Sequence, residues 1–203
     1  MKLKRKILNS LVRAGIISPV PFLKLHSWSH MVADRLSIEC EADGIHPKQR
    51  IIKYKEWFLD QISAGAVVID VGCHEGQMVH VLADKAVFVY GIEILADRYK
   101  QACRTRPGKN IEYILGDATA YDYSHLRPIN VVTLSNVLEH IQHRVEFLKK
   151  LTNRVKWAPG KKIILIRVPM IVRDWMVLYK KERGLEWRSD NTHFIEYTED
   201  VFR

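Results

Sequence analysis

The chain has 203 residues, which is long enough for one domain with a sizeable hydrophobic core. Its 47% hydrophobic and 27% charged residues are typical of a globular protein, and no apolar run approaches the roughly 20 residues that a membrane-spanning helix needs. The net charge of +9 favours anionic partners without choosing among nucleic acid, anionic lipid and phosphorylated substrates. The three cysteines form no Cys-x-x-Cys pair, which favours a reducing, cytoplasmic location over a disulfide-stabilised secreted protein.

The first 47 residues are expected to form an N-terminal helical extension. Residues 2–14 predict a basic amphipathic helix, which either makes peripheral contact with an anionic membrane or packs on the domain with a solvated outer face. Pro19 and Pro21 are expected to break the chain after it. A second helix is expected over Leu25–Leu36, followed by a loop over residues 37–47.

From Lys48 a helix is expected that ends at Ala64-Gly65, and helices and strands then alternate. Strands are expected at Ala66–Val71, Val87–Glu93, Ile111–Leu115, Asn130–Ser135 and Lys162–Val168. Helices are expected at Gln77–Asp84, Ala96–Arg104 and Leu138–Lys156. Near-continuous apolar strands separated by helices predict an α/β domain over residues 48–203, with a doubly wound, mainly parallel sheet flanked by helices.

Ligands of doubly wound sheets bind beyond the carboxyl ends of the strands, so the residues at these ends are informative. The first strand ends at Asp70 and is followed by a turn with glycines at Gly72 and Gly76, where the helix start exposes N–H groups. Glu93 ends the second strand, 23 residues after Asp70, where a carboxylate can accept both hydroxyls of a ribose. Asp117 follows the third strand and can accept a hydrogen bond from an adenine amino group.

Four segments at these strand ends together resemble a known family. The order Val-Ile-Asp-Val-Gly-Cys-His-Glu-Gly, Tyr-Gly-Ile-Glu, Leu-Gly-Asp-Ala and Ser-Asn-Val-Leu-Glu-His-Ile is similar to that of the class I S-adenosylmethionine-dependent methyltransferases, particularly the type 11 group. The resemblance covers about residues 48–203. It implies a Rossmann-like methyltransferase fold with S-adenosyl-L-methionine as cofactor.

The resemblance also implies which residues bind the cofactor. The methionine part would be surrounded by Asp70, Gly72 and Gly76, together with Cys73 and His74 between the glycines. Glu93 would hold the ribose with the neighbouring Ile94, and Asp117 and Ala118 would border the adenine. Asn136 and Val137 would line the cofactor near its sulfonium.

The sequence departs from the family pattern at two places. His74 stands where the family commonly has a glycine, which puts the geometry of that turn in question. The family's sheet ordinarily ends in antiparallel strands, whereas residues 197–200 predict an N-cap followed by an acidic first helical turn. The chain is therefore expected to lack the antiparallel strands and to be an incomplete domain at its C-terminus.

Methyl transfer from a sulfonium is an in-line displacement, so the protein must position two substrates and remove a proton. His140, just past the fourth strand, is a candidate general base with Glu139 as its orienting group. His193 is a second candidate base, because its place after the fifth strand resembles the region where the family builds its acceptor pocket. A solvent-facing or structural role is the alternative for each histidine.

No metal site is predicted. His26 and His30 have the i, i+4 spacing of paired ligands, but no acidic or third ligand lies nearby in the sequence. A cluster of Glu139, His140 and His143 is conceivable on one helix, but it also lacks an identified further ligand.

The resemblance implies a methyltransferase (EC 2.1.1.-) that transfers a methyl group to a small-molecule, glycan or lipid-linked acceptor, at a hydroxyl. An RNA methyltransferase and a non-catalytic binding module with the same fold are the alternatives. A nicotinamide-binding domain is less well supported, because the Gly-x-Gly-x-x-Gly spacing is absent. The aromatic and basic segment from Asp174 to Trp187 is either an acceptor wall or a helix with one buried side.

Overall fold

The computed structural model describes residues 2–42 and 44–202, with side chains from Lys6 onward. The described chain is divided into two compact units. The first comprises Met1–Ile51 and Asp174–Trp187, and the second comprises Ile52–Arg173 and Arg188–Arg203. Within the described residues, no helix is both long and apolar enough to cross a membrane.

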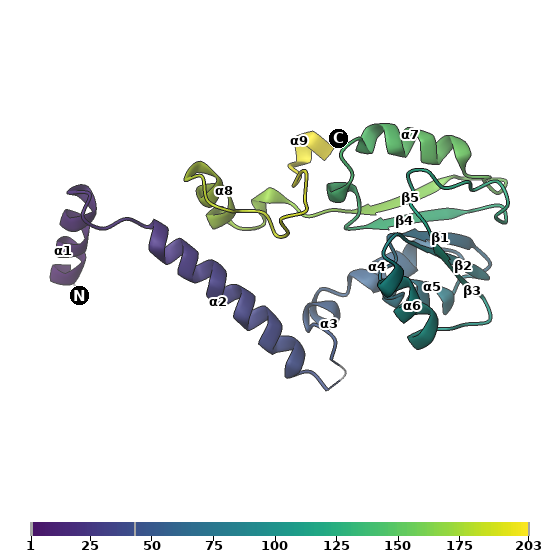
Figure 1. Cartoon of the computed structure of the whole chain (residues 1–203), viewed down its shortest axis with the longest axis horizontal. Helices are drawn as coiled ribbons and strands as arrows, with labels where there is room; N and C mark the ends of the chain where they lie inside the picture. The colour runs from purple at the N-terminus through teal and green to yellow at the C-terminus, as the bar shows by residue number, and fades with distance from the viewer. Residues whose placement is uncertain (1, 43, 203) are drawn as a thin grey trace. The chain divides into compact units, whose positions relative to one another are not determined.

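The first unit is helical and contains α1 (Lys2–Arg13), α2 (Val20–Glu39) and α8 (Trp175–Glu182), drawn in Figure 1. The expected N-terminal helix is confirmed as a helix, and whether it contacts a membrane stays a prediction. The expected break at Pro21 is wrong, because Pro21 lies in the first turn of α2, where a missing N–H removes no helical hydrogen bond. Helix α2 is therefore longer than expected and ends at Glu39.

Two helices expected to be continuous are interrupted. The helix expected from Lys48 is divided into α3 (Lys48–Ile52) and α4 (Tyr54–Gln61) by Lys53, whose φ of 55° is left-handed. The helix expected to begin at Leu138 is instead a short 3₁₀ turn, η1 (Leu138–His140), and a separate helix α7 (Arg144–Arg154). Apolar residues keep their helical spacing across both short breaks, so periodicity does not reveal them.

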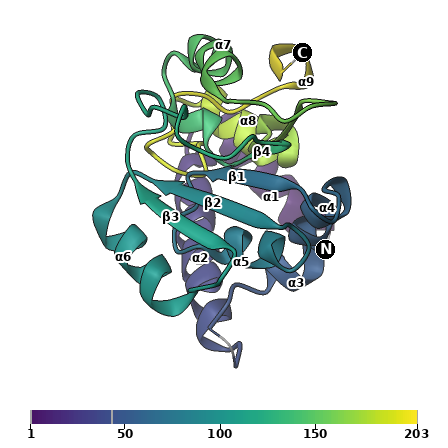
Figure 2. The ribbon, with the colours of Figure 1, turned by 90° about the vertical axis from the view of Figure 1, so that its right-hand side faces the viewer.

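Five parallel strands form the sheet of the second unit, in the order β3-β2-β1-β4-β5 (Figure 1; the first four are also labelled in Figure 2). Their bounds are β1 Val67–Val71, β2 Phe88–Glu93, β3 Ile111–Leu115, β4 Val131–Ser135 and β5 Ile163–Arg167. Helices α5 (Gln77–Ala83) and α6 (Ala96–Thr105) make the first two crossovers, and η2 (Ile171–Arg173) and α9 (Glu199–Phe202) follow β5. The predicted doubly wound parallel sheet is confirmed, and the described residues add no antiparallel strand to it. The strand order reverses between β1 and β4, which is where ligands of such sheets bind.

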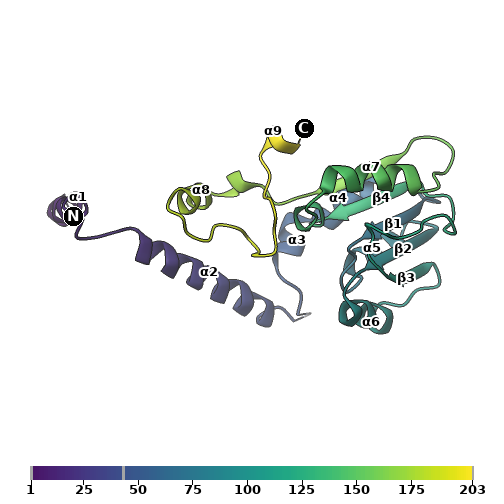
Figure 3. The same ribbon diagram turned by 45° about the horizontal axis from the view of Figure 1, so that its top comes forward.

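Alternate residues of each strand pack on opposite faces of the sheet. Ile69 and Leu134 belong to the core under α7, whereas Val68 and Val131 belong to the core under α4 and α5. Figure 3 shows α7 on one side of the sheet and α5 on the other. Because both faces are covered, the strands are buried, and only their carboxyl ends and the loops beyond them are open for binding.

The centre of β2 is closely packed at Gly91. A Cβ added there would lie 2.8 Å from Val79 Cγ2, 2.9 Å from Cys73 Sγ and 3.0 Å from Tyr113 Cδ1. Gly91→Ala is therefore expected to lower the free energy of unfolding by about 1–3 kcal/mol, as overpacking of a dense core does. Urea unfolding followed by circular dichroism measures this. Gly116→Ala is the control, because its Cβ would meet nothing closer than 3.4 Å, and an equal loss in both variants would contradict the packing argument.

Candidate active site

The turn after β1 has the geometry that its glycines predict. Gly72 and Gly76 have φ values of 67° and 77°, and their neighbours leave no room for a side chain. A Cβ on Gly76 would lie 2.3 Å from Tyr113 Oη, and one on Gly72 would lie 2.8 Å from Val137 Cγ2. His74 also takes a left-handed conformation, with φ of 51°, so the turn keeps the backbone form of a glycine at this position.

Glu93, at the end of β2, links the turn after β1 to the loop after β2 by hydrogen bonds. Its Oε2 accepts a hydrogen bond from His74 N at 2.7 Å, and its Oε1 accepts one from Leu95 N at 2.8 Å. The side chain is only 5% exposed, so both bonds fix the carboxylate in a protected position. Ile94, directly after Glu93, is exposed at the same edge.

Asp70 is buried in β1 beside β4. Thr133 Oγ1 donates a hydrogen bond to its Oδ1 at 2.6 Å, and the two residues are partners in the strand register. Burial raises the pKa of Asp70 to about 7, with the nearby Glu93 adding to the rise and the Thr133 hydrogen bond opposing it. The sequence did not indicate Thr133, although a hydroxyl within the apolar run of β4 is a signal that could have done so.

Cys73 differs from the other residues of the turn, because its side chain is buried in the core under α4 and α5. Burial raises the pKa of its thiol. Its backbone N–H donates to Ile92 O at 3.1 Å. The structure thus places Cys73 at the turn as a packing residue.

The ends of β3 and β4 complete this edge of the sheet. Asp117 is exposed and its Oδ1 accepts from Thr119 N at 2.8 Å, while Ala118 O accepts from Tyr123 Oη at 2.8 Å. Asn136 has a left-handed φ of 57°, and its N–H donates to Arg167 O at 2.8 Å. The glycine turn therefore has the end of β4 on one side and Glu93 on the other.

Beyond β4, the three predicted catalytic side chains lie together. Glu139 Oε1 is 4.0 Å from His193 Nε2, and the rings of His140 and His193 meet edge to face with their centroids 4.7 Å apart. A backbone hydrogen bond from Phe194 N to Glu139 O, 2.8 Å long, holds the two segments side by side. His143 is outside this cluster and occupies the N-cap position of α7.

Protonation in this cluster is set by burial. Burial raises the pKa of Glu139 to about 7, with the Arg167 charge opposing it. Burial and then the charge of His193 lower the pKa of His140, so His140 is mostly neutral at neutral pH. Its Nδ1 lies 2.9 Å from Thr192 Oγ1, which itself lies 2.7 Å from Asp190 Oδ1.

That hydrogen-bond chain assigns the His140 tautomer. Asp190 is an acceptor when ionised, so the Thr192 hydroxyl donates to it and accepts from His140 Nδ1–H. His140 Nε2 is then left with its lone pair available. The sequence indicated neither Thr192 nor Asp190 as partners of His140, since nothing in their spacing connects them to residue 140.

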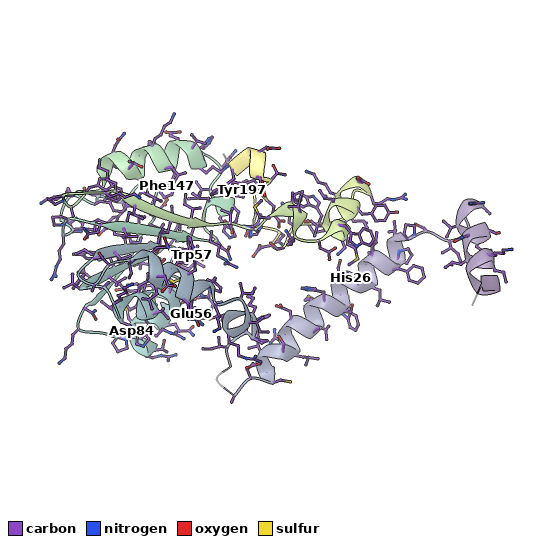
Figure 4. All side chains as sticks on the ribbon, turned by 180° about the vertical axis from the view of Figure 1, so that it is seen from behind. His26, Glu56, Trp57, Asp84, Phe147 and Tyr197 are labelled. Carbon is purple, nitrogen blue, oxygen red and sulfur yellow. The ribbon has the colours of Figure 1, made fainter. Side chains whose placement is uncertain are left out.

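A pocket of about 570 Å³ lies at the carboxyl end of β5. Its walls include five apolar or aromatic side chains, with a cation and a carboxylate: Tyr54, Trp57, Phe58, Met170, Phe202, Arg167 and Glu199. The Arg167 guanidinium stacks 4.3 Å from the centre of the Tyr54 ring. Trp57 is labelled on α4 in Figure 4.

The pocket lies close to the β1 turn. The strand order puts β4 between β1 and β5, so the carboxyl ends of β1 and β5 lie at the same edge of the sheet. Burial raises the pKa of Tyr54, the charge of Arg167 opposes this rise and the charge of Asp70 adds to it. Arg167 also pairs in register with Ser135 at the end of β4. The sequence did not single out Tyr54, Trp57 or Arg167, because they come from α4 and β5 and only the fold brings them together.

A glycine turn, buried acids at the ends of β1 and β2 and an aromatic pocket at the same edge of the sheet are typical of α/β proteins that bind a nucleoside-type cofactor. The profile of a methyltransferase-domain family matches residues 46–202, more than half of the chain. The chain therefore belongs to the class I S-adenosylmethionine-dependent methyltransferases, which confirms the predicted family and its cofactor.

Proteins with known names support the same assignment. The chain is 26% identical over 132 residues to a ubiquinone biosynthesis O-methyltransferase of Idiomarina loihiensis, covering 64% of this chain and 54% of that protein. It is 33% identical over 100 residues to the enzyme of that name from Thiobacillus denitrificans, covering 48% and 42%. The chain thus spans about half the length of the curated relatives it matches.

Among solved structures, the fold is similar to that of magnesium protoporphyrin IX methyltransferase from Synechocystis PCC 6803 with bound S-adenosylhomocysteine. The TM-score is 0.56 at 17% identity, over 77% of this chain and 69% of that one. At this identity the likeness concerns the fold.

The raised pKa of Asp70 predicts how stability changes with pH. Asp70 ionises near pH 3.8 in the unfolded chain and near pH 7 in the folded protein. Its contribution to stability is therefore full at low pH and is lost as the pH rises between these two values. Through Asp70, the free energy of unfolding falls by at most about 1.4 kcal/mol per pH unit. Asp70→Asn, which keeps an acceptor for Thr133, is expected to gain about 1–3 kcal/mol relative to the parent between pH 5 and pH 7.5.

Urea unfolding of chelator-treated protein, without cofactor, at several pH values measures this difference. Asp84→Asn is the control, because Asp84 is an exposed aspartate on the same unit. Parallel pH profiles for Asp70→Asn and the parent would contradict the raised pKa.

Proposed function

We propose that this chain is a methyltransferase that uses S-adenosyl-L-methionine to methylate a hydroxyl of a small-molecule or glycan acceptor. The observation that carries the proposal is the edge of the sheet where the glycine turn, Glu93 and the end of β4 converge beside an aromatic pocket. Family membership supplies the reaction class. The relatives named above methylate small molecules according to their names, which favours a small acceptor.

The strand-end residues fit the cofactor. Gly72, His74 and Gly76 form a left-handed turn too crowded for side chains at the glycines, and we assign the methionine part to this turn, with Asp70 at the end of β1 before it. Glu93 is buried and oriented, as a residue that accepts ribose hydroxyls must be. When bound, the cofactor supplies an electrophilic methyl group.

The remaining cofactor contacts come from β3 and β4. We assign Ile94, Asp117 and Ala118 to the ribose and adenine side, where the ends of β2 and β3 adjoin. Asn136 and Val137 border the glycine turn from the other side and are assigned to the region of the sulfonium. Cys73 is assigned to shaping the turn, because its side chain is in the core and its backbone is bonded to Ile92 and Gly76.

The pocket beyond β5 is assigned to the acceptor. Its aromatic walls suit a flat or sugar-like molecule, and Arg167 suits an acidic or phosphorylated group on it. A hydroxyl acceptor must lose a proton during methylation. We assign two candidate acceptors for this proton. The first is His140, whose Nε2 carries a lone pair and whose pKa is lowered, and the second is His193 beside Glu139. These roles apply when no metal ion occupies the cluster.

Cofactor binding is tested with S-adenosylhomocysteine. The parent protein is expected to bind it and to melt at higher temperature in its presence, because a ligand that binds the folded state stabilises it. Glu93→Gln removes the charge that accepts the ribose hydroxyls and is expected to weaken binding by about 10–100-fold. Isothermal titration calorimetry measures both affinities.

Glu112→Gln is the matched control for this experiment, since Glu112 is an exposed glutamate on the neighbouring strand β3. It is expected to bind like the parent. A parent protein that binds no S-adenosylhomocysteine would overturn the proposed function, and unchanged affinity in Glu93→Gln would overturn the role of Glu93.

The acceptor pocket is tested by screening phenolic acids and simple glycosides for formation of S-adenosylhomocysteine. With an acceptor so found, Arg167→Gln is expected to raise KM by about tenfold with kcat within about threefold, because Arg167 is assigned to binding. Arg104→Gln, on α6, is expected to leave both unchanged. A loss confined to kcat in Arg167→Gln would remove Arg167 from acceptor binding.

A further inference from the structure

Among the buried acids of the described residues, Glu139 is the one whose carboxylate lacks a hydrogen-bonding partner. Its side chain has no exposure, and neither carboxylate oxygen has a hydrogen-bond partner among the described residues. Such a group costs about 1–3 kcal/mol or more if nothing satisfies it, so an unsatisfied buried carboxylate in a native fold indicates a missing water, proton or ion. His193 Nε2 lies 4.0 Å from Glu139 Oε1.

The two histidines beside Glu139 are each held by their far nitrogen. His193 Nδ1 lies 3.2 Å from Glu196 Oε1, and His140 Nδ1 lies 2.9 Å from Thr192 Oγ1. Each Nδ1 therefore donates, which leaves the lone pair on Nε2 in both rings. A carboxylate or hydroxyl behind the imidazole is the arrangement that orients histidine ligands in metal sites.

Glu196 is itself fixed, as a supporting residue of such a site should be. It is buried, and Arg173 and Ser189 donate hydrogen bonds to it. Although burial opposes ionisation, these hydrogen bonds lower the pKa of Glu196, so it acts as an acceptor for His193. The orientation of His193 is thus set by a built network rather than by an isolated contact.

We propose that Glu139, His140 and His193 bind one divalent transition-metal ion of the zinc type. Their ligand atoms all lie within 4.8 Å of one another. In the described part of the chain, these three side chains form a group that could hold a metal ion. Two imidazole nitrogens with one carboxylate oxygen suit zinc and its neighbours, whereas calcium and magnesium prefer oxygen ligands.

Binding requires a modest closure. Tetrahedral zinc with bonds of about 2.0–2.2 Å places its ligand atoms about 3.4 Å apart, so the side chains must move inward by about 1 Å. His140 is exposed, so its side chain has room to shift while it keeps the bond to Thr192, and a three-residue site keeps a coordination position open. Glu139 and His140 follow Asn136 and Val137 by two to four residues, so the site lies next in the chain to the residues we assign to methyl transfer. The link to methyl transfer rests on the proposed function.

The metal and base roles are alternatives for the same Nε2 atoms. With an ion bound, His140 and His193 would be ligands and not bases. The cation would then supply the activation, by lowering the pKa of an acceptor hydroxyl at the open position so that its proton passes to water. The sequence did not predict this site, because Glu139 and His140 have no third ligand near them in the chain. His143 was the third residue considered, whereas the fold brings in His193, which is 53 residues after His140.

The experiment uses the full chain, stripped with EDTA, dialysed and titrated with zinc chloride by calorimetry. One ion per chain with a micromolar or tighter Kd is expected, and His193→Gln and His140→Gln are each expected to weaken it at least tenfold, while His143→Gln binds like the parent. His140 is exposed, so its replacement is expected to leave the fold intact, which circular dichroism checks.

A parent protein that binds no zinc, or equal binding in the parent, His140→Gln and His193→Gln, would overturn the proposal. Cobalt(II) in place of zinc adds a readout that is independent of catalysis, because its visible absorption reports histidine ligation. S-adenosylhomocysteine binding is measured on the same samples with and without zinc, so failure of the metal site is distinguished from failure of the cofactor site.

Discussion

The candidate site depends on one buried carboxylate, that of Glu93, which accepts hydrogen bonds from two different loops. His74 N and Leu95 N both donate to it, so the turn after β1 and the loop after β2 are fixed relative to each other. Removing this acceptor would leave two N–H groups in need of partners, at about 1–3 kcal/mol each if both stayed buried. The residue assigned to the ribose is therefore also the residue that shapes the turn assigned to methionine.

Sequence patterns predicted the sheet to within one residue at every strand end, because buried parallel strands are apolar runs bounded by glycine or acid. The helix breaks were not predicted. Lys53 takes a left-handed conformation without being glycine, and the apolar spacing continues through the 3₁₀ turn at Leu138–His140. Periodicity measures which face is buried, and a short interruption leaves that face unchanged.

The acidic strand ends could be named from sequence, because topology brings the carboxyl ends of parallel strands to one edge. The catalytic cluster could be named only in part. Glu139, His140 and His193 were each candidates, but their grouping depends on the hydrogen bond from Phe194 N to Glu139 O, which joins segments far apart in the chain. Their supporting partners, Thr192 and Glu196, become visible only once that contact is known.

Asp70, Glu93 and Glu139 are buried acids that differ in their hydrogen bonds, and the comparison argues for an occupant beside Glu139. Asp70 is bonded to the Thr133 hydroxyl, and Glu93 is bonded to two backbone N–H groups. Glu139 has neither, yet it faces an imidazole whose far side is bonded to an ionised carboxylate. A proton on Glu139 would satisfy one oxygen at most, whereas a cation shared with two imidazole lone pairs compensates the whole charge. That difference is why we place a metal ion, rather than a proton alone, at the end of β4.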